Sequence, residues 1–292
     1  MTLAHVLSLD VEDYFQVLNL RKQCPKDSWD QIELRCAAPT RLFLDLLDEY
    51  DAKASFFCLG WIAERLPDLI GEIAARGHEV ASHGYDHECL PDLGPDGFRE
   101  DLRRTAAILE PLSGQRPKSF RACTWSITDK TPWALPILAE EGYRRDSSIH
   151  PVPHPEYGMP KAPLFAHELE PLSGKKLFEL PPLVVERFGK RLALGGGGYL
   201  RLFPVRWIHK ALRHRERIGE PSCIYLHPWE LDPGQPRMGA GGLKGFRHYV
   251  GLAKTERKLR FLLERHAFTT MEKVEAAWRQ RPPGAQSKQR SE

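Results

Sequence analysis

Two histidines, His83 and His87, are four positions apart in the stretch SHGYDH. Neutral imidazole nitrogens bind divalent transition metals, so such a pair could form part of a metal site. Spacing alone is weak evidence, because 12 histidines in 292 residues give about half a chance pair at this separation. His150 and His154 have the same spacing in HPVPHPEYG, where the prolines break any regular element. The surrounding elements must therefore decide.

Composition limits the kinds of protein to consider. With 41% hydrophobic and 28% charged residues, the chain is expected to be globular, with one large α/β domain or two small ones. The net charge of +3 is small and the basic residues are dispersed, which argues against a nucleic-acid partner. The start, MTLAHVLSLDVEDYF, lacks a signal-peptide pattern, and no apolar run is long enough for a membrane span. We therefore expect a cytoplasmic protein.

The cysteines show no C-x-x-C motif and no close pairing of spacings. In such a chain they are expected to be reduced thiols rather than a disulfide framework: Cys24, Cys36, Cys58, Cys89, Cys123 and Cys223.

Short apolar runs alternate with helical stretches through the first half of the chain. Strands are predicted over 5–11, 53–60, 78–82, 118–123 and 142–149. Helices are predicted over 40–50, 67–76, 96–112 and from Thr131 to Gly142. This alternation favours a parallel sheet or barrel with the helices outside.

The second half is less regular. A proline-rich connection is predicted over 150–176, followed by strands within 176–185, 190–204 and 222–230. Pro204 opens a predicted helix, and a long helix is predicted over 245–265, before a short strand in 267–271. We expect one domain over 1–280, with an extension from about 150, and a disordered tail over 281–292.

Ionisable side chains gather where the predicted strands end. In parallel α/β folds these ends share one face, where functional groups collect. Taken singly, Asp10 could be a helix cap, His227 a buried structural histidine, and Arg121 a partner of Asp146. Five strand ends together favour a site, and they carry Asp10, Glu12 and Asp13; His83 and His87; Arg121; Asp146; and His227.

The stretches at these strand ends resemble a known family. In chain order, SLDVEDYF, SHGYDH, FRACTW, RRDSS and IYLHPWE are similar to the five motifs of the polysaccharide deacetylases, also called the NodB homology domain or carbohydrate esterase family 4. The resemblance covers roughly residues 3 to 280. DVEDYF, FFCLGWIAER, GGGGYLRLFP and HYVGLAKTERKL further resemble a subgroup found with exosortase-linked exopolysaccharide clusters. The resemblance implies an α/β fold, a distorted (β/α) barrel of the NodB type.

The resemblance also implies an activity and residue roles. The reaction would be metal-dependent hydrolysis of an N-acetyl group on a sugar, which cleaves a non-peptide carbon–nitrogen bond of a linear amide and releases acetate. Asp10 would be the general base, His227 the general acid, and Arg121 and Asp146 would orient Asp10 and tune His227. The metal ligands would be His83, His87 and a carboxylate.

Two departures from the family pattern affect these assignments. The family has adjacent aspartates in its first motif, whereas Val11 follows Asp10 here. Residues 10 and 12 face the same side of a strand, so Glu12 is the expected ligand, with Asp13 as the alternative. In the third motif Cys123 and Thr124 replace proline and tyrosine. A backbone amide near Thr124 could still stabilise an oxyanion, whatever its side chain.

Other features near the motifs have two interpretations each. Trp61, Trp125 and Trp229 could stack on a sugar ring or pack in the core. The glycines of Gly195–Gly198 could let the backbone approach a substrate or form a mobile hairpin, but they lack the spacing of a nucleotide fingerprint. Cys123 has no assigned role.

The expected cofactor is a divalent metal ion, zinc in the first place, with cobalt, nickel or iron as alternatives. The expected substrate is an N-acetylated carbohydrate, and a cytoplasmic enzyme would meet a lipid-linked exopolysaccharide precursor rather than the exported polymer. One alternative is an allantoinase-like hydrolase acting on a non-sugar amide. Another is a sugar-binding protein that has lost catalysis. The sequence leaves the sugar and the oligomeric state open.

Overall fold

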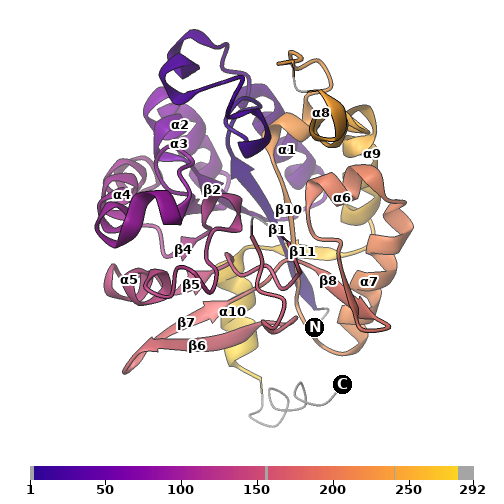
Figure 1. The fold of residues 1–292 in the computed structure, drawn as a ribbon. Helices are drawn as coiled ribbons and strands as arrows, with labels where there is room; N and C mark the ends of the chain where they lie inside the picture. Colours follow the sequence, from indigo (N-terminus) through magenta and orange to yellow (C-terminus); the bar gives the residue numbers. More distant parts are fainter. Residues whose placement is uncertain (1–2, 155–156, 240, 282–292) are drawn as a thin grey trace.

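The fold is built on one nine-stranded sheet, seen in the computed structural model, which describes residues 3–154, 157–239 and 241–281 (Figure 1). The strand order is β10-β1-β2-β3-β4-β5-β7-β6, and β11 pairs with β1. The strands are β1 (Ala4–Val11), β2 (Ser55–Cys58), β3 (Glu79–Ser82), β4 (Ser119–Phe120), β5 (Arg145–Asp146), β6 (His167–Leu172), β7 (Lys175–Glu179), β10 (Cys223–Leu226) and β11 (Ala267–Thr269). β8 (Val184–Arg187) and β9 (Lys190–Ala193) form a separate hairpin.

The sheet curls into a distorted barrel. All its named pairings are parallel except β6 with β7. After β7, Pro182 forms a parallel bridge to Cys223, and the Leu183 amide donates to the Cys223 carbonyl at 2.9 Å. This bridge returns the chain from β7 to β10 at the far edge of the sheet. The predicted α/β barrel of the NodB type is therefore confirmed.

Helices surround the sheet, as Figure 1 shows. The apolar run of β1 explains its place at the centre, because every residue from His5 to Val11 is buried. The helices are α1 (Ala37–Glu49), α2 (Gly60–Arg65), α3 (Pro67–Ala75), α4 (Leu90–Ser113), α5 (Ala134–Glu140), α6 (Gly197–Leu202), α7 (Val205–Arg217), α8 (Gly242–Tyr249), α9 (Thr255–Leu263) and α10 (Met271–Arg279). No helix in the described ranges is long and apolar enough to cross a membrane.

The second half of the chain departs most from expectation. The predicted connection over 150–176 contains β6, and the predicted helix over 245–265 is divided into α8 and α9 at Gly251, whose φ is +72°. Strands predicted over 118–123 and 142–149 shrink to two residues each, and α10 was not predicted. The predicted tail lies outside the described residues apart from Arg281.

The glycine run over 195–198 opens α6 rather than forming a mobile hairpin. A Cβ atom on Gly197 would lie 1.7 Å from Oε2 of Glu230, and one on Gly195 would lie 2.6 Å from the Leu183 amide nitrogen. The glycines therefore let the chain pack closely against β10 and the loop that follows it.

Candidate active site

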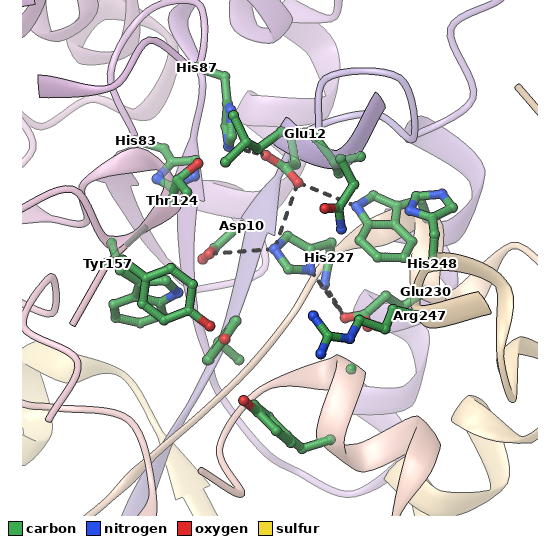
Figure 2. Close-up of a pocket in the computed structure, with 18 of the residues that line it drawn as sticks. Asp10, Glu12, His83, His87, Thr124, Tyr157, His227, Glu230, Arg247 and His248 are labelled. Carbon is green, nitrogen blue, oxygen red and sulfur yellow. Dashed lines mark hydrogen bonds and ion pairs between the residues drawn. The ribbon is translucent and has the colours of Figure 1, made fainter. Parts of the chain in front are cut away.

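A pocket lies at the carboxyl ends of β1, β3 and β10 and is partly covered by α6 and α8 (Figure 2). Five of the predicted site residues line it, namely Asp10, Glu12, His83, His87 and His227. Side chains that sequence reasoning missed also line it, among them Tyr157, Tyr199, Arg201, Glu230, Arg247 and His248. Residues from both halves of the chain thus form one cavity.

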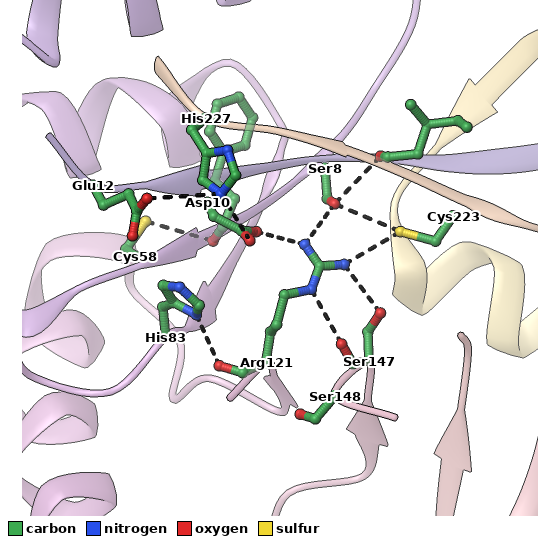
Figure 3. Close-up of polar contacts among 12 residues, drawn as sticks. Ser8, Asp10, Glu12, Cys58, His83, Arg121, Ser147, Ser148, Cys223 and His227 are labelled. Carbon is green, nitrogen blue, oxygen red and sulfur yellow. Dashed lines mark hydrogen bonds and ion pairs between the residues drawn. The ribbon is translucent and has the colours of Figure 1, made fainter. Parts of the chain in front are cut away.

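Asp10 is fixed by a buried arginine. Arg121 donates from Nη1 to Oδ1 of Asp10 at 2.5 Å and to Oγ of Ser8 at 2.9 Å. The rest of the guanidinium donates to the backbone oxygen and the hydroxyl of Ser147 at 3.1 and 3.0 Å (Figure 3). Arg121 and Asp10 are both buried, so their charge-assisted hydrogen bond fixes the orientation of the Asp10 carboxylate. Arg121 therefore makes the contact with Asp10 that its expected orienting role requires.

Glu12 lies beside His87. Oε2 of Glu12 is 2.8 Å from Nε2 of His87, and Trp229 donates from Nε1 to Oε1 at 3.3 Å. Burial alone would raise the pKa of Glu12, but the charges of His87 and His227 lower it to about 2. Glu12 is therefore a carboxylate, the form that binds metal ions.

The backbone just after β4 orients His83. Its Nδ1 is 2.8 Å from the carbonyl oxygen of Arg121, so Nδ1–H donates and Nε2 is left with a lone pair. Burial lowers the pKa of His83 to about 4, which keeps the ring neutral. A neutral imidazole with one nitrogen tied to a backbone carbonyl is the usual state of a metal ligand.

The neighbouring carboxylate, Asp13, has a different role. Its Oδ2 accepts from the backbone amides of Arg35 and Cys36 at 2.6 and 2.8 Å, and its Oδ1 accepts from the Tyr14 amide at 2.8 Å. Asp13 therefore holds the segment that leads into α1 and does not line the pocket. Between the two candidates, the placement favours Glu12 as the carboxylate ligand.

His227, directly after β10, lies near three carboxylates that line the pocket. Its Nε2 is 3.9 Å from Oδ2 of Asp10 and 3.7 Å from Oε1 of Glu12. Its Nδ1 is 3.1 Å from Oε2 of Glu230, whose Oε1 accepts from Nε of Arg201 at 2.7 Å. Burial alone would lower the pKa of His227, but the charges of Glu12 and Glu230 raise it to about 9. The ring is thus held in its protonated form by carboxylates on both sides.

The structure does not place Asp146 beside His227, the residue that Asp146 was expected to tune. Oδ1 of Asp146 is 2.5 Å from Oγ of Ser148, and burial raises the pKa of Asp146, which lies beside Glu179. No hydrogen bond or ion pair joins Asp146 to His227 within the described ranges. Glu230 has the role that was predicted for Asp146. The short 3-10 helix after β10, Pro228–Leu231, places the Glu230 carboxylate beside the ring of His227. The sequence HPWE could have predicted the contact between Glu230 and His227. Glu230 lies three residues after His227, which is the spacing of a capping box, and the structure contains this capping box.

The donor set fits a catalytic divalent metal. His83 and His87, together with Glu12, would offer two imidazoles and one carboxylate, which leaves coordination positions open for water and substrate. Among the described residues, the ligand atoms that lie within 4.8 Å of one another here are those of His83, His87 and Cys123, whereas Glu12 contacts His87 alone of these three. However, Sγ of Cys123 lies 2.9 Å from the His83 carbonyl oxygen as a donor, and burial raises the pKa of this thiol well above its usual value. In this structure the Cys123 thiol is therefore a hydrogen-bond donor to the backbone.

Two of the three candidate tryptophans lie at the pocket. Trp125 and Trp229 line it, and Trp229 stacks between the rings of His227 and His248, with ring centroids 5.1 and 4.3 Å away. Trp61 instead packs against Trp29 in the core. Thr124 lines the pocket in a left-handed conformation, with φ at +55°.

Among the described residues, His150 and His154 belong to no group of potential metal ligands. His150 is buried edge-on against Trp125, with ring centroids 5.1 Å apart, and His154 stacks on Tyr157 at 3.8 Å. The spacing of four in this pair therefore reflects chance, as the sequence context indicated.

Comparison with known protein families gives two matches along the chain. Residues 28–144 match the family "polysaccharide deacetylase", and residues 147–276 match a domain of unknown function, DUF3473. His83, His87 and Arg121 fall in the first match, and Arg201, His227 and Glu230 fall in the second. Asp10 and Glu12 precede both.

Curated relatives match over short segments. A peptidoglycan-N-acetylglucosamine deacetylase of Bacillus cereus is 38% identical over 82 residues, which cover 28% of this chain and 30% of that protein. A chitooligosaccharide deacetylase of Sinorhizobium fredii is 44% identical over 61 residues, covering 21% and 26%. The peptidoglycan-N-acetylmuramic acid deacetylase PdaC of Bacillus subtilis is 31% identical over 93 residues, covering 32% and 20%. The chain thus spans less than a third of these relatives.

Solved structures share the fold over nearly the whole chain. A polysaccharide deacetylase of Mycobacterium smegmatis superposes with a TM-score of 0.62 at 22% identity, covering 97% of this chain and 96% of that one. The allantoinase Puue gives a TM-score of 0.60 at 16% identity, covering 96% and 90%. At these identities the likeness concerns the fold alone.

Proposed function

Because this chain carries a polysaccharide deacetylase domain over residues 28–144 and a DUF3473 domain over residues 147–276, we propose that it is a metal-dependent hydrolase that removes N-acetyl groups from a carbohydrate. The products would be acetate and a sugar with a free amine. The observation that carries the proposal is the approach of Oδ2 of Asp10 to Nε2 of His227, 3.9 Å apart, beside His83, His87 and Glu12. A base, an acid and a metal-ligand set thus share one pocket.

Asp10 is the proposed general base. Its Oδ1 is occupied by Arg121, which leaves Oδ2 to take the proton of the attacking water. The divalent metal held by Glu12, His83 and His87 would lower the pKa of that water and polarise the acyl oxygen. Arg121 acts through Asp10 by keeping its carboxylate in one orientation.

His227 is the proposed general acid. Its protonated Nε2 faces the same space as Asp10 Oδ2, and Glu230 accepts from Nδ1–H and stabilises the charged ring. The proton would pass from Nε2 to the departing amine as the carbon–nitrogen bond breaks. Glu230 is in turn fixed by Arg201 on α6, so the DUF3473 region supplies both the acid and its support.

An oxyanion would be stabilised near Thr124. The turn Cys123–Trp125 borders the pocket, and Thr124 and Trp125 both have positive φ, of 55°. A backbone held in this sparsely populated conformation is a feature of sites in which an amide is aimed at a ligand. Trp125, Tyr157 and Tyr199 offer aromatic faces for a sugar ring.

We further propose zinc as the metal and a lipid-linked exopolysaccharide precursor, met in the cytoplasm, as the substrate. Two imidazoles and one carboxylate suit zinc, and also cobalt, nickel or iron. The resemblance of four stretches to the exosortase-linked subgroup supports the exopolysaccharide assignment. Cell fractionation checks the location, since a periplasmic or secreted native protein would remove the reason to prefer a precursor.

The test of activity by metal-reconstituted protein measures acetate release from the acetylated sugars and consumption of allantoin, which has no acetyl group to release. The panel contains N-acetylated oligosaccharides, a lipid-linked N-acetylated sugar and allantoin, with His83→Ala and Asp10→Asn beside the wild type. Acetate release from sugars that both variants abolish, with metal lost in His83→Ala alone, supports the proposal. Turnover of allantoin alone favours an amide hydrolase of the same fold. Stoichiometric metal and sugar binding without any turnover favours a sugar-binding protein.

A further inference from the structure

A second cluster of potential metal ligands lies at the opposite end of β1. His5 is the second residue of this strand, Glu216 is near the end of α7, and His266 directly precedes β11. One ligand atom from each lies within 4.8 Å of the others. Oε1 of Glu216 is 2.7 Å from Nδ1 of His266 and 3.7 Å from Nε2 of His5. Three elements far apart in the sequence therefore direct two imidazoles and one carboxylate oxygen toward a common point.

His5 is the informative member of this cluster. It is fully buried, and neither ring nitrogen has a hydrogen-bond partner among the described residues. An unpaired buried polar group costs free energy, so such groups normally have a protein, water or ion partner. Burial also lowers the pKa of His5 to about 4, which leaves a neutral ring. A neutral imidazole whose Nε2 is 3.7 Å from a carboxylate oxygen has a lone pair that a metal ion between the two groups could accept.

The groups around the cluster have the arrangement typical of metal sites. Nε2 of His266 is 2.9 Å from Nδ1 of His209, so the nitrogen of His266 that faces away from Glu216 has an outer partner. The second oxygen of Glu216 accepts from Nη1 of Arg213 at 2.8 Å. These contacts fix the ring and the carboxylate so that Nδ1 and Oε1 point inward. A hydrogen-bond network without a metal accounts for His266 and Glu216, but it leaves Nε2 of His5 at 3.7 Å from Glu216, beyond hydrogen-bond distance.

We propose that His5, Glu216 and His266 bind a second divalent metal ion, of the zinc class, which fastens the start of β1 to α7 and β11. The chemistry of the donors is the same as in the pocket, two imidazoles and a carboxylate, and suits zinc. The role differs, because residues 5 and 10 on one strand are about 16 Å apart at roughly 3.3 Å per residue. This metal would stabilise the fold and would take no part in the pocket's chemistry.

The test separates the two sites by variants. In a His83→Ala background, which removes a proposed pocket ligand, zinc is titrated and bound metal is measured by elemental analysis after desalting. We expect about one zinc ion per chain and a rise of Tm with zinc. Adding Glu216→Gln should weaken this binding by about 10-fold or more and abolish the rise, because the amide carries no charge. The matched control is Glu256→Gln, which also removes a carboxylate paired with an arginine, Arg260, and should change neither readout.

A second measurement is independent of any variant's folding. An anomalous difference map of zinc-loaded wild-type crystals should show one peak beside His83 and His87 and another between His5, Glu216 and His266. A map without the second peak, or equal zinc binding by the His83→Ala protein with and without Glu216→Gln, would overturn the proposal. Loss of the pocket peak alone would count against the proposed function and leave the second site standing.

Discussion

The two ends of β1 carry similar donor atoms in different surroundings. At the carboxyl end, Glu12, His83 and His87 line an open pocket; at the amino end, His5 lies close to Glu216 of α7 and to His266. Beside the pocket cluster, the proposed base, Asp10, and the proposed acid, His227, are 3.9 Å apart. The other cluster is bordered by His209 and Arg213, which hold its ligands in place. The ligand atoms of a site determine which metals it suits, whereas the residues around the ligands determine whether the metal could serve catalysis or only stabilise the fold.

The largest effect is expected from Asp10→Asn. The amide keeps the shape of Asp10 but cannot accept a proton, so acetate release should fall by ~10²–10⁴-fold, the usual contribution of general acid–base catalysis. Bound zinc should stay the same, because Asp10 is not among the proposed ligands. Asp27→Asn, on the surface, serves as the control. An active Asp10→Asn enzyme would remove the distinction between the two ends of β1.

Glu12→Gln and Asp13→Asn should separate the two adjacent carboxylates. The first should lose pocket zinc and activity together, because it removes a charged ligand. The second should keep zinc but lower the free energy of unfolding by about 1–3 kcal/mol, since three backbone amides lose a charged acceptor. Metal content and urea unfolding measure both effects. Zinc loss in Asp13→Asn with full retention in Glu12→Gln would reverse the assignment.

Glu230→Gln and Asp146→Asn should show which carboxylate supports His227. Replacing Glu230 should lower kcat by about 10–100-fold with little change in KM, the usual size of an effect on an orienting partner. Replacing Asp146 should leave kcat nearly unchanged, because its side chain contacts Ser148 instead of His227. Steady-state kinetics on the best substrate decides, and the opposite ranking would restore the role predicted for Asp146.

The smallest effect on catalysis is expected from Glu216→Gln. The kcat at saturating zinc should equal that of the wild type, while Tm should fall, since the amino-terminal end of β1 loses its proposed fastening. Thermal unfolding and acetate release on the same preparation provide the measurement. A large fall in kcat at unchanged Tm would mean that the two ends of β1 are functionally coupled.

Local patterns sufficed for much of the first half of the fold. The apolar run of β1 and the alternation of strands and helices up to β5 specify a parallel sheet. Each helix and strand can be recognised because its apolar residues recur with the spacing typical of that element. The second half was harder to predict. The prolines in this half made β6 hard to recognise. The requirement for glycine at position 197, where α6 begins, comes from close contact with Glu230, a residue 33 positions away.

For the site, the sequence by itself determined the catalytic candidates. Asp10, His83, His87, Arg121 and His227 follow strands whose ends must share one face, so their gathering follows from strand order in a parallel barrel. Tertiary structure decided the rest. It turned Asp13 toward backbone amides and Glu12 toward His87, placed Glu230 instead of Asp146 beside His227, and brought His266 and Glu216 to His5. These choices depend on loop paths and on contacts between distant elements, and no local pattern of residues encodes such contacts.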